Sequence, residues 1–311
     1  MARPSYGRAY PRPVLRSGTP PPEVGALARA LGGGLEPELL FGIGGGAGFG
    51  RFNYGAAVTL LTRVSTSENE RDAFLAVICR RLRVPFRLQV ASSEPAAVKR
   101  LRGALDAGLT PVLWVNPDAL PWPSFPTAYH AVAVLEITGG RACVDDGEAR
   151  SLPVEKLLAA SGTPGARHRT LIVEAPPKAP PPAAAVRQGL SDHLEQMWEG
   201  WGPPTVRSRF GLAGLTGWAR TIAEDNARGE DLGSQILMRG GGPAMRLAHA
   251  RFLELAGQAA AAAAARRSAE AWAELGQSLL LGAATTKQVA AVRDTEQACL
   301  ETIERAFQLR V

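Results

Sequence analysis

Apolar positions along this chain follow two kinds of spacing in its first half and one kind in its second. Helical spacing in the first half predicts helices over residues 22–31, 69–82 and 94–107. Short apolar or alternating runs predict strands over residues 86–90, 111–115, 130–138, 141–145 and 170–173. In the second half only helical spacing recurs, and it predicts helices over residues 186–198, 212–226, 243–265, 268–281 and 286–309. The fold is therefore expected to be an α+β domain followed by an all-α helical bundle.

A proline-rich stretch separates the two halves. PPKAPPPAAA, residues 176–185, has five prolines in ten positions and favours a stiff, extended linker over a packed element. The chain is accordingly divided into four parts: a basic Pro/Arg-rich arm (1–20), the α+β domain (21–175), the linker (176–185) and the helical bundle (186–311).

The strongest local signal is a hairpin. HAVAVLEIT and RACVD are two apolar runs separated by Gly139-Gly140, which is typical of a two-residue turn. In that register Asp145 faces Val134 and not His130. A contact between His130 and the acidic pair Asp145-Asp146 then needs a bulge, a longer turn or a strong twist.

Composition narrows the class of protein. The chain has 311 residues, 46% hydrophobic and 21% charged, which is typical of a soluble globular protein. No apolar run reaches the roughly 20 residues of a membrane span, and no signal-peptide pattern is present. The arginines behind the net charge of +6 are spread over many segments, so no nucleic-acid or membrane partner is expected. Three widely spaced cysteines indicate neither a disulfide framework nor a metal site and favour a cytoplasmic, reduced setting.

The glycine-rich stretch LLFGIGGGAGFG, residues 39–50, does not fit the phosphate-binding motifs. A Walker loop needs Lys and Ser/Thr after its last glycine, but Gly50 is followed by Arg51 and Phe52. A dinucleotide fingerprint needs a preceding strand and an acid ending the next one, and neither is predicted here. The alternative is a tight loop whose glycines let backbone and neighbours approach closely.

His130 is the best candidate for chemistry among the four histidines. It begins the first hairpin strand, and an acidic pair that could orient its ring ends the second. No nucleophile accompanies it: Cys79 falls in a predicted apolar helix face, Cys143 pairs with Glu136 in the hairpin, and Cys299 lies in the helical half. From the residues alone, His130 is a base without a nucleophile.

Three stretches together resemble a known family: GALARAL…GLEPELLFGIGGGAGF (25–49), YHAVAVLEI…CVDD (129–146) and GLAGLTGWARTIAEDN…RGGGPAMRLAHARFLELA (211–256). They are similar to BtrH-type proteins, named for the butirosin biosynthetic acyltransferase, which often carry a helical C-terminal domain. The resemblance implies a papain-like, cysteine-peptidase-type fold used for acyl transfer. A Cys at the N-terminus of the first helix would attack a carrier-protein thioester, a His would activate it, an Asp would orient the His, and an amine would accept the acyl group.

Carried over by this resemblance, His130 matches the base and Asp146 or Asp145 the orienting acid. The expected His-Cys pair falls on Pro21-Pro22, so the nucleophile position is Pro22 and the thiol is missing. The resemblance further implies that the loop (Gly44, Gly45, Gly46 and Phe49) forms a substrate-binding wall. The glutamate expected just ahead of the loop is matched loosely by Glu36 or Glu38.

Two hypotheses follow, and whether the protein is an enzyme stays open between them. In the first it is a pseudoenzyme of natural-product or modified-peptide (RiPP) biosynthesis that binds an acyl-carrier-tethered or peptide substrate. In the second it is an active acyltransferase or amide-forming enzyme that moves an acyl group from a carrier thioester to an amine, with His130 as base. The expected partners are an acyl carrier protein or precursor peptide and a small-molecule amine. No cofactor is expected, and a homo-oligomer is compatible with the sequence.

Overall fold

The computed structural model describes residues 20–52, 57–59, 73–122, 130–177, 180–200, 209–226, 229–238 and 242–307. Nearly all of the predicted basic arm lies outside these ranges, as do residues 69–72 of the second predicted helix. The α+β part followed by a helical part confirms the predicted fold class.

A six-stranded sheet forms the centre of the α+β part. Its strand order is β3-β8-β4-β5-β6-β7, and every neighbouring pair is antiparallel. Its strands are β3 (Phe86–Gln89), β4 (Val112–Val115), β5 (His130–Thr138), β6 (Arg141–Asp145), β7 (Ala149–Pro153) and β8 (Thr170–Val173). A separate two-stranded sheet pairs β1 (Gly50–Phe52) with β2 (Ala57–Thr59).

Helices cover both faces of the six-stranded sheet because its central strands are apolar on both sides. Ala131 and Ala133 of β5 belong to the buried cluster shared with α1 (Pro22–Ala30), α2 (Pro37–Ile43) and α3 (Ala73–Leu82). Val132 and Val134 belong to the cluster on the other face. That cluster also contains residues of α4 (Glu94–Asp106) and α5 (Val154–Ser161). The alternation along β5 is the period of two expected of a strand.

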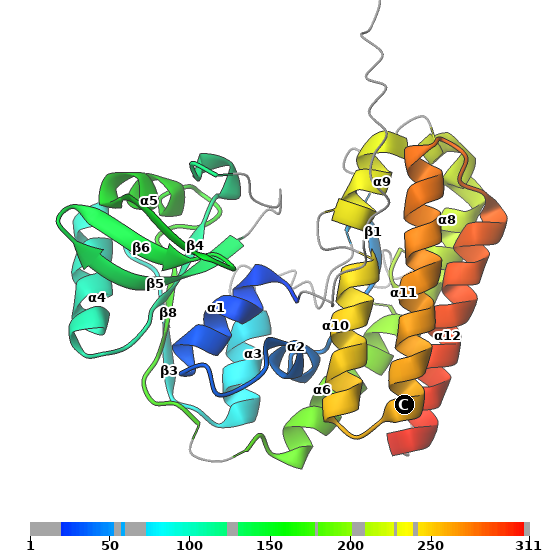
Figure 1. The fold of residues 1–311 in the computed structure, drawn as a ribbon, viewed down its shortest axis with the longest axis horizontal. Helices are drawn as coiled ribbons and strands as arrows, with labels where there is room; N and C mark the ends of the chain where they lie inside the picture. Colours follow the sequence, from blue (N-terminus) through cyan, green and yellow to red (C-terminus); the bar gives the residue numbers. More distant parts are fainter. Residues whose placement is uncertain are drawn as a thin grey trace, which may run out of the picture.

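The second half consists of helices in the described ranges. They are α6 (Ala183–Trp198), α8 (Gly211–Asp225), α9 (Gly229–Met238), α10 (Gly242–Leu255), α11 (Ala259–Leu280) and α12 (Thr286–Phe307). In Figure 1, α1, α2 and α3 lie between the sheet and these helices. The contacts of α2 with α6 and α10 join the two halves.

One predicted helix boundary was wrong. Helices were predicted over 243–265 and 268–281, but the break falls at residues 256–258. Gly257 has φ +75°, and its N–H donates to the Glu254 carbonyl while Gln258 N–H donates to the Leu253 carbonyl. This glycine C-cap ends α10. The alanine run then begins α11 and continues through Arg266 to Leu280.

Several short elements were not predicted: α2, α5, α9, β7 and the small β1–β2 sheet. Each is ten residues or shorter, so its periodicity covers three turns at most. PELLFGI, which forms α2, is apolar along most of its length. Short apolar runs do not distinguish helix from strand by pattern alone.

The glycine loop packs against the helical half. A Cβ on Gly42 would lie 2.0 Å from the Phe252 ring of α10, and one on Gly46 would lie 2.4 Å from Nδ1 of His249. Arg246 of α10 donates from Nη2 to the Gly48 carbonyl at 3.1 Å. The largest buried cluster accordingly contains residues from both halves, Phe41 and Phe252 among them.

Helices α2 and α6 approach each other through their backbones. A Cβ on Gly189 of α6 would lie 2.2 Å from the Gly42 carbonyl oxygen and 2.9 Å from Cα of Ile43. Both neighbours are backbone atoms, which have little freedom to move aside. We therefore expect Gly189→Ala to lower the free energy of unfolding by about 1–3 kcal/mol.

Gly103 provides a matched control, because it is also helical and an added Cβ meets nothing within 4 Å. Gly103→Ala should leave stability unchanged or raise it by up to about 1 kcal/mol. Urea unfolding of both variants measures the difference, and equal stabilities would contradict the α2–α6 contact.

Two buried histidines lie beneath the glycine loop. The rings of His193 and His249 have centroids 4.3 Å apart, and each residue is 2% exposed. Burial is the main cause that lowers the pKa of His193 to about 4, and burial also lowers the pKa of His249. The positive charge of Arg246 lowers both pKa values further.

We expect these imidazoles to make the fold sensitive to acid. The folded protein keeps His193 neutral while the unfolded chain protonates it near 6.5, so this stability is present above pH 6.5 and lost as the pH falls toward about 4. For His193 alone the loss is on the order of 3 kcal/mol. In His249→Leu, one buried imidazole is gone, and the loss between pH 6.5 and 4 should be smaller. Unfolding free energies measured across this interval test the expectation, and equal losses in both proteins would contradict it.

Candidate active site

The candidate site forms where the start of α1 meets the start of β5. Pro22 is the first residue of α1, and Pro21 precedes it as N-cap, with Val24 N–H donating to the Pro21 carbonyl at 2.9 Å. Proline suits this position because its missing N–H would have no helical partner. Helix α1 packs against β5, and Val24, Leu27 and Ala28 are buried.

A β-bulge shifts the hairpin by one residue. Thr138 pairs with Arg141 and Glu136 with Cys143, as the two-residue turn predicts. Beyond Leu135 the register shifts, so that Asp145 lies opposite Ala133 and not opposite Val134. The bulge is one of the three ways in which the sequence allowed the acidic pair to reach His130.

The structure distinguishes the two candidate acids. Asp146 Oδ1 lies 2.5 Å from Nε2 of His130, whereas Asp145 pairs with Arg29 of α1 at 2.9 Å. Neighbouring residues of an extended chain point to opposite faces, which accounts for the different partners. Of the two matches left open by the sequence, Asp146 therefore has the geometry of the orienting acid.

Asp146 is held by a second donor. Trp122 Nε1 donates to Asp146 Oδ2 at 2.6 Å, and the Arg150 guanidinium lies 5.1 Å from the Trp122 ring centroid. The carboxylate thus has a partner for each oxygen. Because Asp146 accepts a hydrogen bond from Nε2 of His130, Nδ1 is the nitrogen left to accept a proton.

Burial and pairing shift the pKa values of the two residues in opposite directions. Burial by itself would raise the pKa of Asp146, but the hydrogen bond and charge of His130, helped by Trp122 and Arg150, lower it below its ordinary value. Burial by itself would lower the pKa of His130, but the hydrogen bond that His130 donates to Asp146 and the charges of Glu23 and Asp146 raise it. The pair therefore favours a carboxylate beside an imidazole that protonates readily.

Glu23 is a site residue that the sequence analysis missed. It is the second residue of α1, directly after Pro22, and it is partly exposed. Burial raises its pKa, the charge of His130 lowers it, and the charge of Asp146 raises it. An acid in the first turn of a helix is common, because it complements the helix dipole. The sequence therefore did not mark Glu23 as a site residue.

None of the three cysteines of the chain lies at the start of α1. Cys79 of α3 and Cys299 of α12 are buried, which raises the pKa of each thiol to about 12. Cys143 lies on β6 opposite Glu136. Buried thiols such as those of Cys79 and Cys299 are inert as nucleophiles.

The loop residues expected to form a substrate wall lie in the interior. Gly44, Gly45 and Gly46 are buried, and an added Cβ on them would approach Phe74, Asp192 and His249 respectively. Phe49 is 1% exposed and packs against both Trp218 and Trp272, with ring centroids 5.9 Å from each. The close approach expected of the glycines is therefore made to protein side chains.

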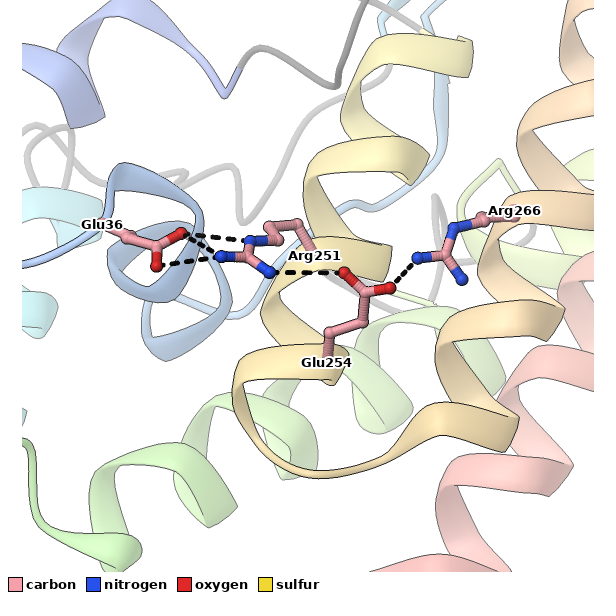
Figure 2. A network of polar contacts seen from close by, with 4 residues as sticks. All are labelled: Glu36, Arg251, Glu254 and Arg266. Carbon is pink, nitrogen blue, oxygen red and sulfur yellow. Dashed lines mark hydrogen bonds and ion pairs between the residues drawn. The ribbon is translucent and has the colours of Figure 1, made fainter.

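Of the two glutamates ahead of the loop, Glu36 has a defined partner. Arg251 of α10 donates to both of its carboxylate oxygens at 3.0–3.1 Å, and Figure 2 shows the chain of contacts continuing to Glu254 and Arg266. These side chains are about half exposed, so the network contributes little free energy. It ties α2 to α10 and α11 and lies outside the His130 site.

The described ranges contain neither a candidate metal-binding cluster nor a candidate membrane-spanning helix. No group of three or more His, Cys, Asp and Glu side chains there is arranged to hold a metal ion. No helix there is long and apolar enough to cross a bilayer.

The first half is an α+β domain in which the His130–Asp146 pair lies at the start of β5, the strand against which α1 packs. Residues 23–147 match the family model described as butirosin biosynthesis protein H, N-terminal. This part of the chain is similar to that family, which confirms the resemblance seen in the sequence. The match ends before the helical half, and no curated protein matches the chain.

We expect Asp146→Asn to lower the pKa of His130, because it removes a carboxylate that stabilises the imidazolium. NMR titration of the histidine Cε1 protons measures this, with His130→Gln assigning the resonance. Asp145→Asn is the matched control: it removes the neighbouring carboxylate, which pairs with Arg29. An equal shift of the His130 pKa in both variants would contradict the assignment of Asp146.

Proposed function

We propose that this BtrH-like protein catalyses acyl transfer from a carrier-protein thioester directly to an amine, without an acyl-enzyme intermediate. His130 acts as the base. Asp146 orients its ring and raises its pKa. The observation that carries the proposal is the 2.5 Å contact of His130 with Asp146 at a helix start that offers no thiol. A natural-product or modified-peptide pathway is the setting that the family suggests.

The chemistry balances without a covalent enzyme intermediate. The neutral amine attacks the thioester carbonyl, and the ammonium of the tetrahedral adduct loses a proton to Nδ1 of His130. The adduct then collapses, the C–S bond breaks, and the imidazolium returns the proton to the departing thiolate. The products are an amide and a free thiol.

The raised pKa of His130 bears on this role. A raised pKa favours the imidazolium, which is the form that returns the proton to the thiolate. The basic form grows as the pH rises through that pKa, so the transfer rate should rise over the same interval.

Binding without catalysis is the second candidate. The observation that favours it is Pro22 at the nucleophile position, since a protein that lost its thiol can retain the fold and the substrate surface. In this hypothesis the ligand is an acyl-carrier-tethered group or a precursor peptide, and the His130–Asp146 pair is structural.

Turnover distinguishes the two candidates. We expect wild type to convert an acyl-N-acetylcysteamine thioester and n-butylamine to the amide, and His130→Ala to lose about 10²–10⁴-fold in rate. Cys143→Ala, which removes the most accessible thiol, should retain the wild-type rate. Circular dichroism establishes that the variants are folded.

An unchanged rate in His130→Ala would contradict the assignment of the base. Binding of an acyl-loaded carrier protein without any amide formation by wild type would contradict the transfer reaction and leave the binding hypothesis.

A further inference from the structure

The second hydrogen-bond donor to Asp146 is the indole of Trp122. Its Nε1 donates to Asp146 Oδ2 at 2.6 Å, while Oδ1 of the same carboxylate lies 2.5 Å from Nε2 of His130. Because each oxygen has its own partner, the carboxylate cannot rotate about its Cβ–Cγ bond without losing a hydrogen bond. An indole N–H is a donor only, so the bond from Trp122 favours the ionised form of Asp146.

The backbone of Asp146 is already fixed by the turn after β6, where its N–H donates to the Glu148 carbonyl at 3.1 Å. The side-chain torsions are the freedom that remains, and Trp122 restricts them from a distant part of the chain, 24 residues before Asp146. The Asp146 side chain is 6% exposed, so little water reaches it to replace the indole N–H.

The indole of Trp122 is itself held in place. The guanidinium carbon of Arg150 lies 5.1 Å from the ring centroid, and Arg150 pairs with Glu148. A guanidinium over an indole face is a favourable cation–π arrangement. The ring also packs against the buried cluster that contains Leu120 and Val132. The position of the N–H donor is therefore set by contacts that do not involve His130.

The charges around Asp146 do not replace this hydrogen bond. The charged side chains near it come from β5, β6, β7 and α1, and they are His130, Asp145, Arg150, Glu23 and Arg29. A charge a few ångströms away changes the energy of the carboxylate but does not select a rotamer, whereas a hydrogen bond depends on direction. The bond from Trp122 therefore fixes where Oδ2 points.

We propose that Trp122 is a positioning residue of this site, which holds the Asp146 carboxylate so that Oδ1 stays directed at Nε2 of His130. Arg150 holds the indole in turn. The catalytic meaning of this inference rests on the proposed transfer reaction. The positioning of the carboxylate does not rest on it and can be measured without substrate.

NMR titration of the His130 Cε1 proton in Trp122→Phe tests the positioning, because this variant keeps an aromatic ring and removes the N–H. A carboxylate released from the indole spends less time against Nε2, so the pKa of His130 should fall. If the carboxylate stayed in place without the indole, it would be a more basic partner, and the pKa of His130 would not fall.

Trp218→Phe is the matched control. Trp218 Nε1 donates to Asp225 Oδ2 at 2.8 Å, so this variant breaks the same kind of indole–carboxylate bond in the helical half. It should leave the pKa of His130 unchanged. Circular dichroism establishes that both variants are folded.

Turnover provides a second readout. Trp122→Phe should lower kcat about tenfold, the size expected for the loss of one hydrogen bond to a charged group. KM for n-butylamine and for the thioester should not change, because Trp122 acts through Asp146 and not on the substrates. Trp218→Phe should retain the wild-type kcat.

The proposal is overturned if Trp122→Phe leaves the pKa of His130 unchanged or raises it, or if Trp218→Phe lowers it equally. A wild-type kcat in Trp122→Phe would also overturn it. Its failure is distinguishable from that of the transfer reaction. A wild type that forms no amide would refute the reaction, and the His130 titration would still decide whether Trp122 positions Asp146.

Discussion

The whole structure depends on how closely the glycine loop approaches the helices of the second half. Gly42 lies under the Phe252 ring, Gly46 lies against His249, and Gly189 lies over the Gly42 carbonyl. A side chain at any of these positions would meet an atom at 2.0–2.4 Å. Because these glycines lack a Cβ, α2 can lie in contact with both α6 and α10. The two halves consequently share one buried cluster.

That shared core has a consequence for the site. Helix α1 belongs to the same cluster as the loop and α10, while its first turn lies at the start of β5. The helical half thus supports the position of Glu23 through packing, without contributing a residue to the His130–Asp146 pair. The surface network from Glu36 to Arg266 adds a polar link at the edge of the same contact.

The start of α1 carries an acid, Glu23, whose pKa is shifted by the charges of His130 and Asp146. A helix start and an imidazole would stabilise a thiolate, and here they act on the carboxylate of Glu23. The hydrogen bond to Asp146 and the charges of Glu23 and Asp146 raise the pKa of the imidazole. An imidazole with a raised pKa beside a carboxylate is suited to proton transfer.

The sequence by itself determined the longer elements, the hairpin and the candidate pair. Gly139-Gly140 fixed the turn, and the bounds of β5, β6 and β8 were predicted correctly, because each has strong alternation or an apolar run between turn residues. The motif around His130 and Asp146 also indicated the family, which the match to residues 23–147 confirms.

Only the tertiary structure decided which acid contacts His130, what the glycines approach and which charges act on His130. A bulge at Leu135 and the alternation of side chains select Asp146 over Asp145, and neither is set by local pattern. The partners of Gly42 and Gly46 lie some 200 residues away along the chain, beyond any local periodicity. Glu23 is an ordinary first-turn acid in the sequence, and it becomes a site residue because α1 packs against β5.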